Sequence, residues 1–106
     1  MMSFGFKIKP TGRGGLHIYT RNGYIVSCQM GQSTYSDNYE TYGEIAPTST
    51  MEVAIWEADG DFNSARIING DEICPFVLCS NMFEIVEAVE GNDWDRVEFL
   101  CEDSTK

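Results

Sequence analysis

The stretch LHIYTRNGYIVSC, residues 16–28, decides the fold class. Two runs rich in β-branched and aromatic residues flank the pair Asn22-Gly23. This pair between two such runs is a strong hairpin signal, because both residues tolerate the positive φ angles of a tight turn. Upstream, residues 4–9 alternate apolar with small or basic side chains and stop at Pro10, which is typical of a strand with one buried face. The sequence therefore predicts an N-terminal meander of three antiparallel strands.

Further strand signals lie downstream of this meander. Met51, Val53 and Ile55 alternate with other side chains, and Asp59-Gly60 turns the chain toward residues 62–68, so we expect a second hairpin there. Residues 75–78 form a short apolar stretch that is too brief for a helix. A final strand is expected near the C-terminus, where alternating apolar positions include Trp94, Val97, Phe99 and Cys101.

One segment carries a helical pattern, at about 81–90. Asn81 and Glu84 have the spacing of a capping box, and Gly91 is a stop signal. Its apolar positions follow the i, i+3, i+4, i+7 rule of an amphipathic helix, and they are Met82, Ile85, Val86 and Val89. The predicted class is α+β: a mostly antiparallel sheet of five or six strands with this one helix packed on one face.

The length of 106 residues predicts a single domain covering the whole chain. Within it, residues 31–49 are polar, rich in tyrosine and without a clean period, so a long loop is expected there. Loops of this length in small domains often carry function, and tyrosine is enriched at interface hot spots. Tyr35, Tyr39 and Tyr42 are therefore predicted as aromatic anchors for a partner.

Charge is distributed unevenly along the chain. The formal net charge is −10, yet residues 1–36 carry four basic side chains and no acid, whereas residues 37–106 carry all seventeen acids and three basic side chains. The two parts therefore carry +4 and −14. This balance disfavours direct binding to nucleic acid or to an anionic membrane and favours a positively charged partner. The charge distribution is equally consistent with basic N-terminal strands that pair with acidic C-terminal strands in one sheet, while the remaining negative charge aids solubility.

The densest acidic segment spans residues 84–103, where eight carboxylates accompany Arg96 as the sole basic side chain. A row of carboxylates along a helix and an adjacent strand can imitate the phosphates of DNA, which carries one charge per ~1.7 Å of axis. The competing interpretation is the solvated outer face of any amphipathic helix. The residues predicted to contact a basic partner are Glu84, Glu87, Glu90, Asp93 and Asp95.

Metal and catalytic motifs are weak. The four cysteines, at positions 28, 74, 79 and 101, form no C-x-x-C pair, and Cys28 and Cys101 fall in predicted strands where a free thiol behaves as a small hydrophobe. Residues 59–63 resemble the start of a calcium loop but lack its glycine and its closing glutamate. His17 has no Ser or Cys partner at a recognisable spacing and is expected to be an ordinary sheet residue. We expect reduced thiols, no cofactor, no metal and no catalytic residue.

No run approaches the ~18 apolar residues of a membrane span, and the first ten residues lack the apolar stretch of a signal peptide. We therefore expect a cytoplasmic location, which is the host cytoplasm if the protein is viral.

Residues 22–31, NGYIVSCQMG, are followed by Tyr35-Ser36-Asp37-Asn38 and then by residues 52–56, EVAIW, and 59–62, DGDF. This run, over about residues 22–90, resembles small uncharacterised accessory proteins of tailed bacteriophages. The resemblance implies origin more than activity, because such proteins include non-enzymatic inhibitors of host or defence machinery, several of them acidic. It transfers no functional residue to this chain.

Three hypotheses follow. The first is a small, acidic, non-enzymatic binding protein of phage type that inhibits or redirects a basic, nucleic-acid-binding bacterial protein. The second is a structural or assembly protein whose oppositely charged parts attract each other between copies and form a homo-oligomer. The third, a small hydrolase or nucleotide-binding enzyme, has the least support because one histidine and no motif leave only carboxylates for acid–base work.

Overall fold

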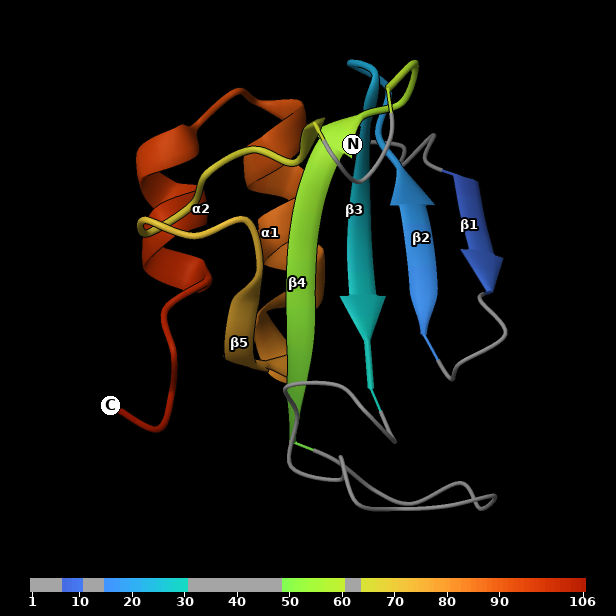
Figure 1. Ribbon diagram of the computed structural model, residues 1–106. Coiled ribbons are helices and arrows are strands. Elements are labelled where there is room, and N and C mark those ends of the chain that lie inside the picture. Colours follow the sequence, from blue (N-terminus) through green and yellow to red (C-terminus); the bar gives the residue numbers. More distant parts are fainter. Residues whose placement is uncertain (1–6, 11–14, 31–48, 61–63) are drawn as a thin grey trace.

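An antiparallel sheet carries two helices on one of its faces (Figure 1). The computed structural model describes residues 7–10, 15–30, 49–60 and 64–106. Its strands are β1 (Lys7–Pro10), β2 (Leu16–Tyr19), β3 (Tyr24–Gln29), β4 (Thr50–Glu57) and β5 (Cys74–Leu78), which neighbour one another in that order. A short 3₁₀ helix (Cys79–Asn81) then leads into α1 (Met82–Glu90) and α2 (Trp94–Leu100). The predicted α+β class with an antiparallel sheet is confirmed.

The hairpin at residues 16–28 is confirmed. β2 pairs with β3, so that Ile18 lies opposite Val26. Gly23 has a φ of 90°, a left-handed conformation that glycine adopts at little steric cost and other residues avoid. β1 pairs with β2 and ends at Pro10, which completes the predicted meander. Residues 4–6 of the first predicted strand, and residues 31–48 of the predicted loop, lie outside the described residues.

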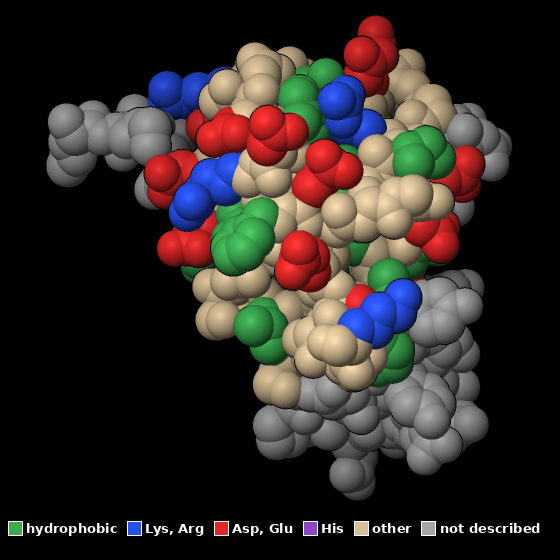
Figure 2. All heavy atoms as spheres, turned by 90° about the vertical axis from the view of Figure 1, so that its left-hand side faces the viewer, with side chains coloured by type: hydrophobic (Ala, Val, Ile, Leu, Met, Phe, Trp, Pro, Cys, Tyr) green, Lys and Arg blue, Asp and Glu red, His purple; other side chains and the backbone are tan. Residues whose placement is uncertain are grey.

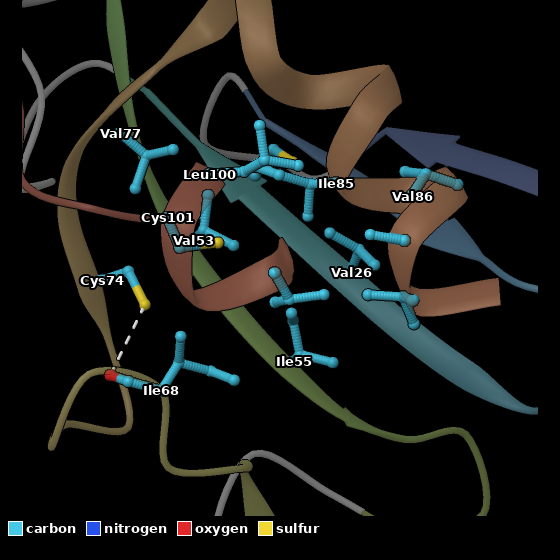
Figure 3. Packing of buried hydrophobic residues seen from close by; sticks show 14 of the residues in the cluster. Val26, Val53, Ile55, Ile68, Cys74, Val77, Ile85, Val86, Leu100 and Cys101 are labelled. Atoms are coloured by element: carbon cyan, nitrogen blue, oxygen red, sulfur yellow. Dashed lines mark hydrogen bonds between the residues drawn. The ribbon is translucent and has the colours of Figure 1, made fainter. Parts of the chain in front are cut away.

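The core lies between the sheet and the helices. Ile18, Val26 and Ile55 face one another across three adjacent strands and are fully buried. Ile85 and Val86 of α1 pack onto the same cluster (Figure 3), so the predicted apolar side of this helix is confirmed. Cys28 and Cys101 belong to this cluster too, as expected for core thiols.

The other face of the sheet also buries side chains. Ile25 lies opposite Tyr19 on one side and Trp56 on the other, and together with Ala54 they form a second, smaller cluster. The His17 ring lies edge-on to Trp56, with 5.3 Å between ring centroids. His17 is therefore an ordinary sheet residue, as expected.

The predicted second hairpin is wrong in its return strand. β4 pairs with β3 and β5, whereas residues 66–68 contribute only an Arg66 N–H that donates to the Ile55 carbonyl at 2.7 Å. Asn69 and Gly70 both have positive φ angles, and they reverse the chain so that Ile68 bridges Asp71. The apolar stretch at 75–78 becomes the partner strand instead. Pro75 fits there because β5 is an edge strand of the sheet and needs no donor on its open side.

The predicted last strand is also wrong, because residues 94–100 form the helix α2. Val97 and Leu100 are buried against the core, and Asp93 caps the helix by accepting a hydrogen bond from the Arg96 N–H at 3.3 Å. The capping box predicted for α1 does not form either. The Asn81 side chain makes no cap hydrogen bond and instead donates to the Leu100 carbonyl at 3.1 Å. This contact joins the start of α1 to the end of α2.

The β2–β3 turn is anchored to the end of α1, and Asn22→Ala tests this anchor. The Asn22 amide donates to the Val89 carbonyl at 2.7 Å and to the Asn92 side chain at 3.3 Å. The substitution removes both bonds, together with the one that the Asn22 side chain accepts from the Thr20 hydroxyl at 2.6 Å, so we expect the free energy of unfolding to fall by about 1–2 kcal/mol. Urea denaturation followed by circular dichroism measures it. Glu87→Ala, on the exposed side of α1, is the control, and an equal loss in the two variants would contradict the anchoring role.

Candidate functional site

The sides of α1 and α2 that point away from the core form the candidate site. In α1, Ile85, Val86 and Val89 point inward, so the polar positions between them are left outside. In α2, Val97 and Leu100 point inward and the remaining positions are exposed or half-buried. We call the exposed side the helical face, and it consists of Glu84, Glu87, Asp95, Arg96, Glu98 and Phe99.

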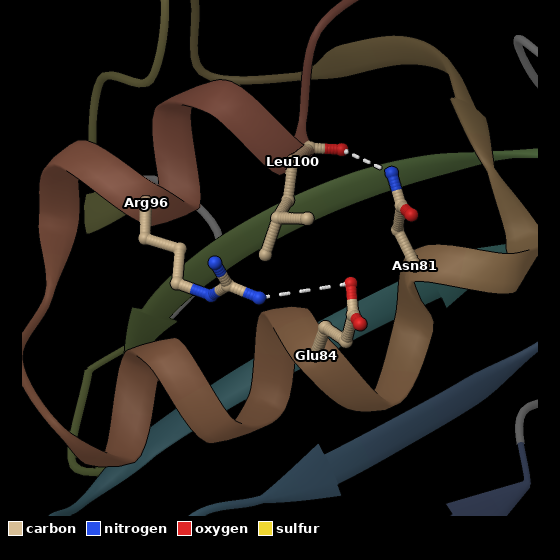
Figure 4. A network of polar contacts seen from close by, with 4 residues as sticks. All are labelled: Asn81, Glu84, Arg96 and Leu100. Atoms are coloured by element: carbon tan, nitrogen blue, oxygen red, sulfur yellow. Dashed lines mark hydrogen bonds and ion pairs between the residues drawn. The ribbon is translucent and has the colours of Figure 1, made fainter.

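An ion pair links the two helices across this face (Figure 4). The Arg96 Nη2 atom lies 3.8 Å from Glu84 Oε2, and both side chains are about half exposed. Exposed pairs of this kind contribute roughly 0–1 kcal/mol, so the contact orients Arg96 more than it stabilises the fold. One of the five predicted carboxylates is thus partly neutralised within the protein.

Two further predicted carboxylates accept hydrogen bonds from backbone N–H groups of the protein itself. Glu90, the last residue of α1, is half-buried and accepts a hydrogen bond from the Arg21 N–H at 3.0 Å. Asp93 caps α2 through its bond from the Arg96 N–H. Carboxylates at a helix N-terminus are favourable because they complement the helix dipole. Glu90 and Asp93 are therefore held in place by intramolecular contacts.

Glu87 and Asp95, one on each helix, are the two predicted carboxylates that are exposed and make no side-chain hydrogen bond or ion pair within the described residues. The five acids therefore do not form one continuous free row, as the phosphate-like arrangement requires. The physical reason is that α2 replaces the predicted strand and its N-terminus needs Asp93 as a cap. Tyr35, Tyr39 and Tyr42, the predicted anchors, lie outside the described residues.

An exposed aromatic side chain lies among these acids and was missed as a site residue. Phe99 of α2 is 69% exposed, and Asp95 precedes it by four residues, which places the two on the same side of the helix. Glu98 is exposed as well. The signal was present, because Trp94, Val97 and Leu100 recur at helical spacing. The period-two spacing of Val97 and Phe99 favoured a strand instead, so the exposed position of Phe99 on a helix was not predicted.

Figure 2 looks onto the side of the molecule that carries the helices. Acidic side chains are spread over it, with hydrophobic and basic side chains between them. Between residues 82 and 100 there are six carboxylates and one arginine. Such a surface attracts cations over distances of about a Debye length, ~8 Å at physiological salt, and Phe99 adds an exposed apolar contact to it.

Neither metal chemistry nor a membrane span is indicated by the described part of the chain. No group of three or more His, Cys, Asp or Glu side chains in it is arranged to hold a metal ion. None of its helices is long and apolar enough to cross a membrane. All four cysteines carry free thiols.

Comparison with protein-family models, with curated proteins and with solved structures finds no match to this chain.

Proposed function

We propose that the protein is a non-enzymatic binding protein whose helical face receives a positively charged protein. The observation that carries the proposal is the exposed Phe99, which lies on α2 beside the exposed Asp95 and Glu98, on a helix that packs against the acidic α1. A single phenylalanine on the surface is ordinary, but one with exposed carboxylates next to it on the same helix offers the two contacts that a basic, partly apolar partner needs.

The two kinds of contact have different tasks. Carboxylates at the rim of an interface steer the encounter and select partners of opposite charge, although each exposed pair contributes little to affinity. An aromatic side chain at the centre loses water on binding and supplies the larger share of the affinity. The net charge of −10 also favours the approach of a positively charged partner.

The partner class proposed is a basic bacterial protein, of the nucleic-acid-binding kind, and inhibition of that protein is the proposed consequence. The phage-type origin belongs to the same proposal. Assembly into a homo-oligomer, the alternative, predicts self-association at low salt that sedimentation velocity detects.

The test is a charge reversal with a matched control. Glu87→Lys with Asp95→Lys alters the helical face, whereas Glu57→Lys with Asp59→Lys alters exposed acids at the end of β4. Each pair replaces one glutamate and one aspartate, so the net charge changes equally. Tagged proteins are incubated with bacterial lysate, washed at about 0.15 M and 1 M salt, with and without competing DNA, and the retained proteins are quantified by mass spectrometry.

We expect the wild type and the β4 variant to retain a basic protein. The retained amount of that protein should be at least tenfold lower with the helical-face variant. Binding lost at high salt and displaced by DNA supports a nucleic-acid-binding partner. Equal losses in both variants would mean that net charge alone attracts the partner, which contradicts a site on the helices. Phe99→Ala separates the apolar contribution, because it leaves the charge unchanged.

A further inference from the structure

Two of the four cysteines meet in a pocket between β5 and α2. Cys74 is the first residue of β5, and Cys101 follows the last residue of α2 as its C-cap. Both line a pocket of about 400 Å³, whose other walls include Ile68, Pro75 and the exposed Glu102. The pocket therefore brings a small solute up to the residues that carry both thiols, whose exposed fractions are 3% and 1%.

Hydrogen bonds hold the two cysteine segments next to each other. The N–H and the Oγ of Ser104 both donate to the Phe76 carbonyl, at 3.0 and 2.7 Å. These residues lie three positions after Cys101 and two after Cys74. The Cys74 Sγ in turn lies 3.9 Å from the Ile68 carbonyl, as Figure 3 shows. The two Ser104–Phe76 bonds thus hold the segments together without using either thiol.

The two thiols also differ in acidity. A hydrogen bond from the Cys101 thiol lowers the pKa of Cys74, against the opposing effects of burial and of the Asp71 charge. The same contact, together with burial, raises the pKa of Cys101. Cys28, by contrast, is buried in the core, and burial raises its pKa to about 12. Cys74 is therefore the thiol that forms a nucleophilic thiolate more readily than its neighbours in the core.

We propose that Cys74 and Cys101 form a redox-active dithiol that peroxides oxidise to a disulfide. The Cys74 sulfur attacks one peroxide oxygen, the O–O bond breaks, and Cys74 sulfenic acid and one water result. The Cys101 sulfur then attacks the Cys74 sulfur and displaces the hydroxyl group, which leaves as a second water after taking up the Cys101 proton. The two thiols lose two electrons, and one hydrogen peroxide is reduced to two waters.

The disulfide would connect the start of β5 to the end of α2, so the helical layer is fastened to the sheet. A cross-link restricts the unfolded chain, and we expect the Tm to rise by about 10 °C on oxidation and to return when dithiothreitol is added. This inference is independent of the proposed binding function, since it concerns the opposite end of α2 from Asp95.

The test uses the folded wild-type protein treated with hydrogen peroxide, alkylated and digested with trypsin without reduction. Cleavage after Arg66 and Arg96 places Cys74 and Cys79 on the peptide 67–96 and Cys101 on the peptide 97–106. We expect these two peptides to become linked. Cys79→Ser is the matched control, because Cys79 shares the peptide with Cys74 but its Sγ contacts the Met30 sulfur at 3.9 Å.

The link should persist in Cys79→Ser and disappear in Cys74→Ser. Two results would overturn the proposal: a link that forms only after the protein is unfolded in urea, or peroxide oxidation confined to Cys79 or Cys28 while the peptides 67–96 and 97–106 stay separate. Mapping the wild type decides between these outcomes even if a serine variant folds poorly.

Discussion

Ile68→Ala is expected to lower the free energy of unfolding by about 3 kcal/mol, whereas Ile67→Ala changes it by less than about 0.5 kcal/mol. Ile68 is 2% exposed and belongs to the main core cluster, while its neighbour Ile67 is 57% exposed. Removing buried methyl groups loses their transfer free energy and leaves a cavity that the surrounding side chains fill only in part. Urea denaturation, with circular dichroism as the readout, gives both values.

The pair is informative because the two residues are identical and adjacent. A strand through residues 66–68 can bury either isoleucine, depending on its register. In the structure the choice is made by the Ile68–Asp71 bridge, in which the N–H of each residue donates to the carbonyl of the other, at 2.8 and 3.1 Å. Similar losses for the two variants, or the larger loss for Ile67→Ala, would show that this segment packs differently.

Trp94→Ala is the second substitution for which a large loss is expected, about 3 kcal/mol. Trp94 opens α2 and packs partly buried against the main core. The Trp94 ring meets the Tyr24 ring edge-on, with 5.1 Å between ring centroids. The Arg66 guanidinium carbon also lies 3.7 Å from the centroid of the Trp94 ring. The substitution removes all of these contacts at once.

Phe99→Ala is the control for this prediction, since it deletes another aromatic side chain of α2 that is exposed. Its unfolding free energy should stay within about 0.5 kcal/mol of the wild type. A double-mutant cycle of Trp94→Ala with Arg66→Ala isolates the cation–π contact, for which we expect a coupling of about 0.5–1 kcal/mol. A larger loss for Phe99→Ala than for Trp94→Ala would reverse the assignment of inner and outer sides of α2.

The candidate site could be predicted only in part. Glu87 and Asp95 lie exposed on the helices, in agreement with the acidic face expected from the charge distribution. Glu90 and Asp93 have intramolecular partners that no local pattern reveals, because Glu90 bonds to Arg21 from the distant β2–β3 turn and Asp93 caps a helix where a strand was expected. The same expected strand included Phe99, so the exposed position of this residue on α2 was not predicted either.

The sequence by itself determined the β2–β3 hairpin and the helix α1. Their signals are local: Asn22-Gly23 provides the backbone conformation of a tight turn, and the apolar spacing of residues 82–89 agrees with one period only. Such local signals favour one conformation before any tertiary contact is considered, although packing against the core stabilises it.

Only the tertiary structure decided the conformation of residues 94–101, the partner of β4 and the meeting of Cys74 with Cys101. The seven residues of α2 agree with both a period of two and a period near 3.6, so their local preferences nearly cancel. The conformation that buries Val97 and Leu100 against α1 and the sheet then prevails, because burial of these side chains outweighs a small difference in propensity.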